Sequence, residues 1–358
     1  MTSRTLTRRD LVQSTAVLAA GVALTADQLD ARAAIPRYGA RPPAGFVRTS
    51  IPGRVVRVNR SNTLQANGLW PKPDAAKRML EGVMSELTGE TDMARAFGKF
   101  VHPEDVVAIK PNGIAGRRGQ TMAANKELIL EVVKGVMAAG VPAERITIFE
   151  QYRDFLWGTR VVTDRNTLAL APEFPSRIKT AVHLNKDASM GYITVAGIPT
   201  KYVRPFTEAT AVINISQIKD HSICGYTGAL KNITHGCNIN PHAFHEHNAS
   251  PQIAHLYAQE VVKSRVVLHI TDAFKVIYDG GPLDKKPECR VPYEAVFATT
   301  DPVAMDVIGW GIVEELRKKH GLPTLTEVGR EPSYIRVAAD LGLGVFDRSE
   351  MTLVTKNV

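Results

Sequence analysis

Cysteine is scarce in this chain, and its few cysteines lack the spacing of a structural framework. Of 358 residues only three are cysteine, Cys224, Cys237 and Cys289, and none forms a C-x-x-C pair. So small a set does not make a disulfide framework, and it argues against an iron–sulfur cluster held by this chain. Cys224 and Cys237 could form one bridge or bind a metal, and two small buried side chains are the alternative.

The chain also has no long run of one charge, no internal repeat and no low-complexity segment. Its formal net charge of +8 comes from 44 Lys and Arg against 36 Asp and Glu, scattered and not interleaved with aromatic residues. This pattern argues against nucleic-acid binding and favours a mild attraction to small anionic substrates. No Walker or dinucleotide-binding fingerprint occurs.

Residues 1–33 have the features of an export signal. The run from Thr7 to Val12 resembles a twin-arginine motif, residues 14–26 are a short alanine-rich apolar segment, and residues 31–33 offer an A-x-A cleavage site. We therefore predict that the twin-arginine translocase exports the folded protein to the periplasm or the exterior. The apolar segment is too short for a stable membrane span. A basic, unstructured N-terminus is the alternative.

The rest of the chain predicts an α/β fold. Residues 34–75, rich in Pro, Gly, Arg and Asn, are expected to form an irregular arm, and residues 76–358 a single α/β catalytic domain. Buried strands alternate with amphipathic helices, which predicts a mostly parallel sheet with helices on both faces. A β-hairpin over 181–203 would form a small appendage or lid. The strands are expected at 105–109, 145–149, 211–215, 265–270, 295–299 and 351–355, and the helices at 74–87, 125–139, 252–263, 301–320 and 332–341.

One stretch, from His221 to His247, concentrates the chemistry. Half of the ten histidines and two of the three cysteines fall inside it, and its apolar residues fit neither helical nor strand period. Glycines interrupt it repeatedly, as in a loop folded around a ligand. Because it follows the predicted strand at 211–215, we expect it at the carboxyl edge of the sheet, where open α/β sheets bind ligands.

The residue types in this stretch indicate a metal or cofactor site. Neutral imidazoles bind nickel, zinc, copper or iron, and free imidazoles transfer protons. A lysine in a dry pocket can lose its proton and act as a nucleophile or as a covalent tether. Glycine amides with a threonine could hold a phosphate or carboxylate. The alternative is a polar surface loop in which histidines cluster by chance. The candidates are His235, His245 and His247 as metal ligands, His221 for proton transfer, Lys231 as amine, and Gly225, Thr227 and Gly228 for an anion.

Other candidates follow predicted strands elsewhere in the chain. The loop from Lys110 to Gln120 could bind an anion through its lysine, Asn112 and two arginines, or be a solvated basic loop. Residues 150–160 could form a second wall of the pocket. Asp272, after the strand at 265–270, could orient an imidazole or serve as a base.

Several motifs resemble a bacterial family catalogued as domain of unknown function 362, which has no established activity. The resemblance covers most of the chain after the signal. It is carried by Lys219-Asp220-His221 and Thr227-Gly-Ala-Leu-Lys231-Asn232, with Ile109-Lys110-Pro111-Asn112, residues 158–160, 301–306 and 341–344.

The central motif also resembles the nickel-pincer lactate racemase family. Lys231 follows His221 by ten residues and His247 follows Lys231 by sixteen, with Gly-Tyr-Thr-Gly between the first two. The resemblance implies that Lys231 tethers a nickel-pincer cofactor, that His247 binds nickel and that His221 transfers a proton. Ala229 and His235 depart from the pattern, where that family has glycine and proline. If the motif is shared, His221, Lys231 and His247 must meet in one pocket.

These observations lead to three hypotheses. The first is an exported metal-dependent enzyme that acts on a small anionic hydroxy- or carbonyl-bearing substrate by racemase-like or isomerase-like proton and hydride transfer, with nickel the favoured metal. The second is a metal-dependent hydrolase with Asp272 as the carboxylate base. The third is a non-catalytic periplasmic metal-binding protein, which would have no use for a glycine-framed Lys231.

Overall fold

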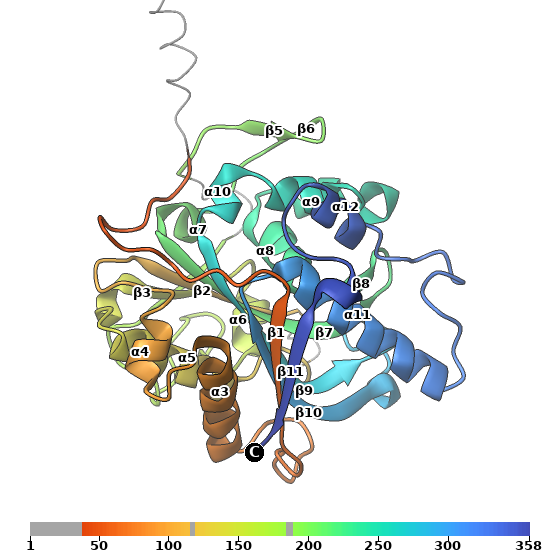
Figure 1. The fold of residues 1–358 in the computed structure, drawn as a ribbon, viewed down its shortest axis with the longest axis horizontal. Helices are drawn as coiled ribbons and strands as arrows, with labels where there is room; N and C mark the ends of the chain where they lie inside the picture. Colours follow the sequence, from red (N-terminus) through yellow and green to blue (C-terminus); the bar gives the residue numbers. More distant parts are fainter. Residues whose placement is uncertain (1–37, 115–118, 184–188) are drawn as a thin grey trace, which may run out of the picture. The chain divides into compact units, whose positions relative to one another are not determined.

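A computed structural model describes residues 38–114, 119–183 and 189–358, and a large β-sheet runs through its centre (Figure 1). Within these residues the sheet has nine strands, eight in the order β11-β1-β10-β9-β7-β2-β3-β4, with β8 paired to β7. The strands are β1 (Arg54–Asn59), β2 (Val107–Pro111), β3 (Ile146–Glu150), β4 (Lys179–Val182), β7 (Ala211–His221), β8 (Gly225–Thr227), β9 (Val266–Ile277), β10 (Arg290–Thr299) and β11 (Thr352–Asn357).

The sheet is mostly parallel, as the sequence predicts. Strands β4, β3, β2, β7 and β9 form a continuous parallel set, and β1 is parallel to β11. Strand β10 runs antiparallel to β1 and β9, and β8 runs antiparallel to β7. The central parallel strands are buried along their whole length, which explains the apolar residues of β2 and of the first half of β7; the polar residues in the second half of β7 are buried as well.

Helices cover both faces of the sheet, which confirms the predicted fold class (Figure 1). Side chains alternate between the two faces: on β1, Val55 belongs to the core under α8, α9, α11 and α12, whereas Val56 and Val58 belong to the core under α3, α4 and α5. The helices are α3 (Pro73–Thr88), α4 (Met93–Phe97) and α5 (Lys126–Ala138) on one face and α8 (Ala229–Cys237), α9 (Gln252–Tyr257), α11 (Pro302–Lys319) and α12 (Tyr334–Asp340) on the other.

The remaining elements are short. A separate two-stranded hairpin, β5 (Ile193–Val195) and β6 (Ile198–Thr200), is the predicted appendage, although residues 181–182 belong to the edge strand β4 instead. The other helices are α6 (Arg153–Gly158), α7 (Arg204–Glu208), α10 (Glu260–Lys263) and the 3₁₀ helices η1 (Ala143–Arg145), η2 (Pro241–Ala249), η3 (Pro287–Cys289) and η4 (Arg348–Glu350).

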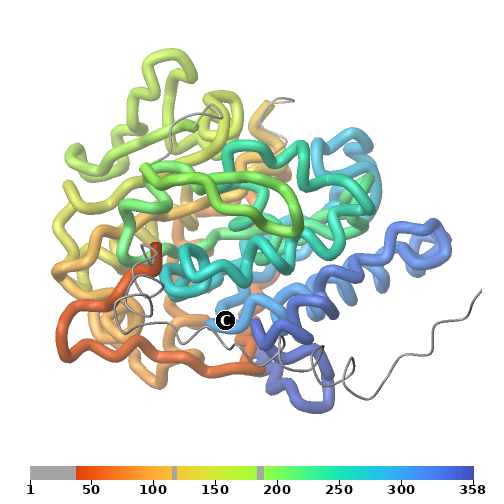
Figure 2. The backbone as a smooth tube through the Cα atoms, turned by 90° about the horizontal axis from the view of Figure 1, so that it is seen from above, coloured from red at the N-terminus to blue at the C-terminus, as the bar shows by residue number. Residues whose placement is uncertain are grey.

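Two sequence-based boundaries are wrong. The expected arm over 34–75 contains β1, which pairs on both sides inside the sheet, and residues 38–358 form one compact unit. The chain before β1 meets the loop before β11, where the Thr352 amide donates to the Gly53 carbonyl at 2.9 Å (Figure 2). The stretch from His221 to His247 is not a loop either, because it holds β8, α8 and most of η2.

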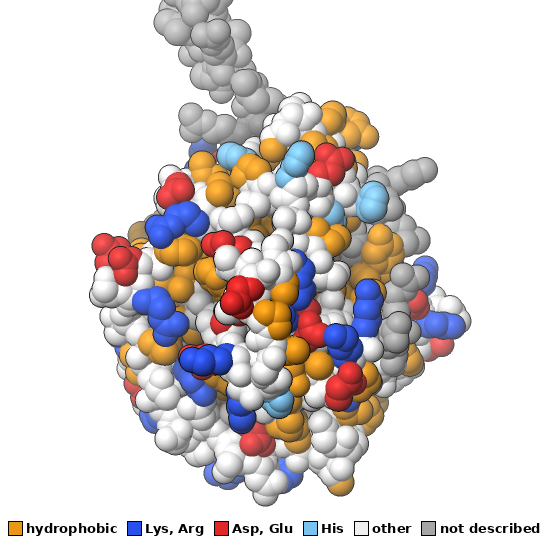
Figure 3. Space-filling model, turned by 90° about the vertical axis from the view of Figure 1, so that its right-hand side faces the viewer, with side chains coloured by type: hydrophobic (Ala, Val, Ile, Leu, Met, Phe, Trp, Pro, Cys, Tyr) orange, Lys and Arg blue, Asp and Glu red, His pale blue; other side chains and the backbone are white. Residues whose placement is uncertain are grey.

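The predicted export signal at 1–33 and the two arginines Arg117 and Arg118 lie outside the described residues. No described helix is both long and apolar enough to cross a membrane. On the face in Figure 3, acidic and basic side chains are interspersed, and several histidines reach the surface.

Asp301 begins α11 as the sequence predicts, and its removal should destabilise the fold. Its carboxylate accepts hydrogen bonds from the amides of Ala304 (2.9 Å), Gly53 (2.8 Å) and Val345 (2.9 Å), and the residue is buried. Asp301→Ala leaves three donors without a partner, so we expect a loss of about 2 kcal/mol in the free energy of unfolding. Urea denaturation measures it. Asp92→Ala is the control, because Asp92 caps α4 at the surface through one amide; equal losses would contradict the argument.

Candidate functional site

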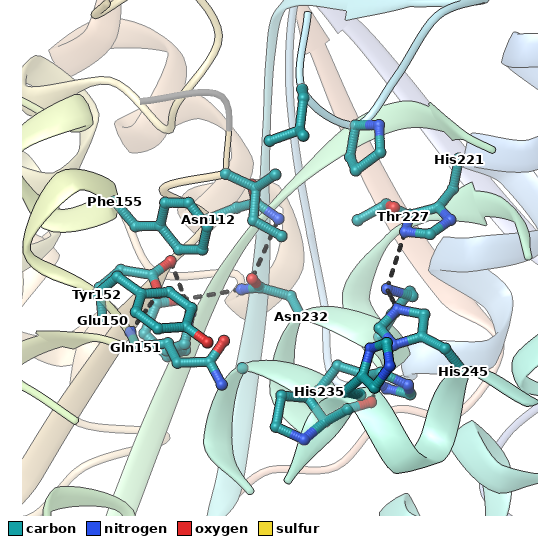
Figure 4. A pocket seen from close by; sticks show the side chains of 18 residues that line it. Asn112, Glu150, Gln151, Tyr152, Phe155, His221, Thr227, Asn232, His235 and His245 are labelled. Atoms are coloured by element: carbon teal, nitrogen blue, oxygen red, sulfur yellow. Dashed lines mark hydrogen bonds and ion pairs between the residues drawn. The ribbon is translucent and has the colours of Figure 1, made fainter. Parts of the chain in front are cut away.

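A cavity of about 290 Å³ opens at the carboxyl ends of β2, β3 and β7 (Figure 4). This is the edge at which open α/β sheets bind ligands. One wall carries Asn112, Glu150, Gln151, Tyr152 and Phe155, from β2, β3 and the segment into α6. The facing wall carries His221, Thr227, Lys231, His235 and His245, from β7, β8, α8 and η2. The predicted second wall over 150–160 is therefore present.

Helix α8 carries Lys231 into the cavity, and a buried carboxylate fixes the start of that helix. Asp306 of α11 accepts hydrogen bonds from the Ala229 amide at 2.5 Å and the Leu230 amide at 3.1 Å. A Cβ on Gly228 would lie 2.1 Å from the Asp306 carboxylate, so only glycine allows this approach. The glycine turn does hold a carboxylate, but the carboxylate belongs to the protein itself. Neither Gly225 nor Gly228 lines the cavity, so the structure does not support the expected role of these two glycines in ligand binding.

Lys231 lies between two imidazoles. Its Nζ is 3.1 Å from Nε2 of His221 and 3.1 Å from Nε2 of His245 (Figure 4). Lys231 is 3% exposed. The sequence thus predicted correctly that His221 and Lys231 share a cavity, and the structure adds His245 as the second neighbour of the amine.

The hydrogen bonds of His221 determine which of its nitrogens carries a proton. Nδ1 accepts from the backbone amides of Ile223 (3.1 Å) and Cys224 (3.3 Å), so the proton of the neutral ring is on Nε2. Nε2 then donates toward Lys231 Nζ, and only an unprotonated amine has a lone pair to accept. The geometry is therefore that of a neutral lysine.

The contacts of His245 agree with a neutral amine at Lys231. Its Nδ1 lies 2.9 Å from the Pro241 carbonyl, which can only accept, so Nδ1 carries the proton and Nε2 accepts from Lys231. Burial lowers the pKa of Lys231 below its usual range, lowers the pKa of His221 well below its usual range, and lowers the pKa of His245 to about 4. The hydrogen bonds of Lys231 and the direction of these pKa shifts both favour the uncharged forms of the three groups.

His235 lines the cavity, but both of its nitrogens face protein groups. Nε2 lies 3.0 Å from the Phe244 carbonyl, and Nδ1 lies 3.2 Å from the Thr234 hydroxyl. Burial lowers its pKa well below the usual range. Its ring is 4.6 Å from the ring of His245, centre to centre, so it packs beside the lysine wall.

Lys110, on the opposite wall, is neutralised by a carboxylate. Lys110 Nζ lies 2.9 Å from Glu150 Oε1 and donates to the Pro111 carbonyl, and both side chains are buried. Glu150 also accepts from the amides of Gly113 and Gln151, each at 2.6 Å. The expected anion binding by Lys110 therefore competes with an ion pair inside the protein.

Four buried side chains under the cavity form a chain of hydrogen bonds that all point one way. Lys219 donates to Asn112 at 2.8 Å, and Asn112 donates to Asn232 at 3.2 Å. Asn232 donates to Asn214 at 2.7 Å, and Asn214 donates to the Ala229 carbonyl at 2.9 Å. Asn112 was a sequence candidate; Asn232 was missed, although it directly follows Lys231.

Two buried polar groups of the cavity have no hydrogen-bond partner among the described residues. They are the amide nitrogen of Gln151, on one wall, and the hydroxyl of Thr227, beside His221 on the other (Figure 4). Unsatisfied buried polar atoms are uncommon because each costs about 1–3 kcal/mol. In a cavity, they indicate positions where a ligand supplies the missing partner.

His247 is where the sequence-based expectation fails. The backbone takes positive φ angles at His247 (50°) and Asn248 (57°), which turns this part of η2 outward. His247 is exposed and does not line the cavity, whereas His245 does. The expected meeting of His221, Lys231 and His247 in one pocket is thus wrong, and the residues fit a lysine-tethered pincer group only in part.

Asp272 is also not at a strand end, because β9 continues to Ile277. Its buried carboxylate accepts from the backbone amide of Asn125 at 2.6 Å and from the Asn125 side chain, which fixes the start of α5. It does not line the cavity, so the structure does not support its expected catalytic role. Cys224 and Cys237 are buried free thiols.

The described residues contain no group of three or more His, Cys, Asp or Glu side chains arranged as a metal site. The hydrogen bonds of the cavity histidines agree with the absence of a metal site among these residues. Each of His221, His235 and His245 uses one nitrogen for a backbone partner, and the nitrogens of His221 and His245 that face each other are separated by Lys231.

The fold and the cavity define an α/β protein with a buried lysine between two histidines in a pocket at the carboxyl ends of its parallel strands. Residues 107–311 match the family described as Domain of unknown function (DUF362), and the chain belongs to that family. The match includes every residue of the two walls described above. No curated protein matches the chain.

The stability of the α8 start should depend on pH in a defined direction. Burial raises the pKa of Asp306 to about 7, although two backbone amides favour its charged form. Between the ordinary aspartate pKa and about 7, the folded protein keeps a proton that the unfolded chain has lost, so this residue's contribution to stability falls as pH rises. Asp306→Asn lacks this titration. The unfolding free energy of the wild type minus that of the variant should therefore fall between pH 4 and pH 7. A difference that grows would contradict the raised pKa.

Proposed function

We propose that this protein is an enzyme that acts on a small hydroxy- or carbonyl-bearing molecule through the amine of Lys231. The observation that carries the proposal is the hydrogen bond from His221 Nε2 to Lys231 Nζ, which requires an unprotonated amine. An ammonium group is neither a base nor a nucleophile, whereas a buried neutral amine is both.

The two histidines would serve the amine in different ways. His245 Nε2 accepts from Lys231, so it can take up a proton, and the Pro241 carbonyl would stabilise the resulting imidazolium. His221 has its other nitrogen held by two backbone amides, so it remains a fixed donor. The pair thus supplies one proton acceptor and one proton donor on either side of Lys231.

The cavity limits the substrate to a small molecule. Its volume of about 290 Å³ lies at the lower end of ligand pockets, and its partnerless groups at Gln151 and Thr227 would bind oxygen atoms. Dependence on nickel or another transition metal, and export by the twin-arginine route, remain predictions from the sequence. Metal analysis and N-terminal sequencing of protein from its native host test them.

Exchange of carbon-bound hydrogen tests the proposal. Wild-type protein in D₂O would be mixed with a panel of small hydroxy ketones, hydroxy aldehydes, 2-hydroxy acids and 2-oxo acids, and NMR would follow loss of the C–H signal next to the carbonyl or hydroxyl. We expect at least one compound to exchange at a rate proportional to protein concentration. Heat-unfolded protein is the control for free lysine. No exchange above that control, with any compound, would contradict the proposal.

A further inference from the structure

The position of Lys231 Nζ determines how it can meet a substrate. The amine is held by one donor, His221, and one acceptor, His245, and both of these nitrogens lie on the cavity wall. When a ligand oxygen replaces Nζ as the acceptor of the His221 proton, the amine lone pair becomes free. A ligand bound in this way has its carbonyl oxygen at His221 and its carbonyl carbon toward Lys231.

We infer that Lys231 Nζ adds to the carbonyl carbon of a small uncharged aldehyde or ketone and holds it as an imine. This inference rests on the proposed function, because it requires the neutral amine. It goes further in naming a covalent intermediate and a substrate class. Direct removal of a proton by Lys231, without a covalent bond, would also satisfy the proposed function.

The step balances with groups that line the cavity. The nitrogen lone pair forms the N–C bond, and the C=O π electrons move to oxygen. His245 Nε2 takes a proton from the new ammonium and returns it to the alkoxide, which gives a neutral carbinolamine. The C–O bond then breaks, the nitrogen forms the C=N bond and loses its second proton to the departing hydroxide, and one water leaves. No oxidant or reductant is consumed.

Two donors stand where the negative oxygen would form. His221 Nε2–H belongs to a residue of the cavity wall and donates to Lys231 Nζ, and the Thr227 hydroxyl beside it has no partner among the described residues (Figure 4). Donors fixed before the reaction stabilise an oxyanion without reorganisation. The two groups come from neighbouring strands, since His221 ends β7 and Thr227 ends β8.

The charges of the cavity favour an uncharged substrate. Among the described residues that line it, Lys110 and Glu150 carry opposite charges and pair at 2.9 Å. Lys231 and its two histidines are neutral by their hydrogen bonds, so none of them, nor the paired Lys110, offers a free cation to a carboxylate. The partnerless Gln151 amide nitrogen, on the far wall, would bind an acceptor oxygen at the other end of the molecule.

Reductive trapping tests the inference. Wild-type protein at pH 7 would be treated with glycolaldehyde and cyanoborohydride, which reduces C=N to a stable amine, and peptide mass mapping would locate the adduct. We expect Lys231 to be modified at least about tenfold faster than the exposed Lys318, because its hydrogen bonds hold the free amine, whereas an ordinary lysine with a pKa of about 10.4 is almost fully protonated at pH 7. Unfolded protein, in which this preference must disappear, is the control.

The outcomes separate the two levels of the proposal. Preferential trapping at Lys231 supports the imine. Hydrogen exchange in the panel without trapping at Lys231 overturns the imine and leaves amine catalysis standing. If neither exchange nor trapping is observed, both the imine and amine catalysis are overturned. Glyoxylate, which is similar in size to glycolaldehyde but charged, should be trapped at Lys231 more slowly; faster trapping would overturn the assignment of an uncharged substrate. Because the mapping uses the wild-type chain, it does not depend on whether a Lys231 variant folds.

Discussion

Lys231→Met should lower the hydrogen-exchange rate of the best panel compound by about 10²–10⁴-fold, the usual contribution of a positioned acid–base group. Methionine has a similar length and no amine, so it fills the space between His221 and His245 without a base or a nucleophile. Because the hydrogen bonds of the buried Lys231 already favour the uncharged amine, the substitution leaves no unpaired charge inside the protein, and the variant should still fold. Rates would be measured by NMR beside thermal unfolding of each protein.

Lys275→Met is the matched control for this experiment. Lys275 is also buried, and burial lowers its pKa to about 8, but it donates to the carbonyls of Leu69 and Thr121 and does not line the cavity. It tests whether loss of any buried amine affects exchange. A Lys231→Met protein that is folded and exchanges as fast as wild type would show that the amine has no part in the reaction.

Glu150→Ala should destabilise the protein by about 3–5 kcal/mol, the usual cost of removing one partner of a buried ion pair. The variant leaves Lys110 as a buried cation without its carboxylate, and it removes the acceptor for the amides of Gly113 and Gln151. All of these groups are at the cavity, so the wall around Asn112 should loosen as well. The midpoint of urea unfolding measures the loss.

Two further variants identify the cause of that loss. Glu86→Ala removes the partner of Lys356 in a half-exposed pair at 2.7 Å, and it should cost less than about 1 kcal/mol. Adding Lys110→Met to Glu150→Ala removes the stranded cation and should restore part of the stability. If the double variant is no more stable than Glu150→Ala, the two side chains do not act as a pair.

Much of the fold could be predicted because buried parallel strands have distinctive sequences. The apolar runs at 107–111, 146–150 and 211–215 all fall in strands near their predicted positions. Strand β1 was missed because Arg54 and Arg57 interrupt its valines in a segment rich in turn residues. Strand β9 was cut short because Asp272 and Lys275 look like loop residues, although both are buried against partners from distant segments.

The candidate site was found where chemistry is local in sequence and missed where it is not. His221, Lys231 and His245 lie within one short stretch, so their clustering was visible. The partners that define their environment come from elsewhere: Glu150 and Gln151 from β3 and its loop, and Asp306 from α11. His247 was misplaced because residue spacing does not reveal the left-handed turn that carries it outward.

The chain of amides beneath the cavity has a consequence for how rigid its floor is. The Ala229 carbonyl can only accept, so the Asn214 nitrogen must face it, and the orientations of Asn232 and Asn112 follow in turn. No single amide can flip without breaking the bonds of its neighbours, so the three behave as one unit with a permanent polarity. The floor of the cavity therefore has the same arrangement before and after a ligand arrives. Any conformational adjustment during binding falls to the walls, where Gln151 and Thr227 await a partner.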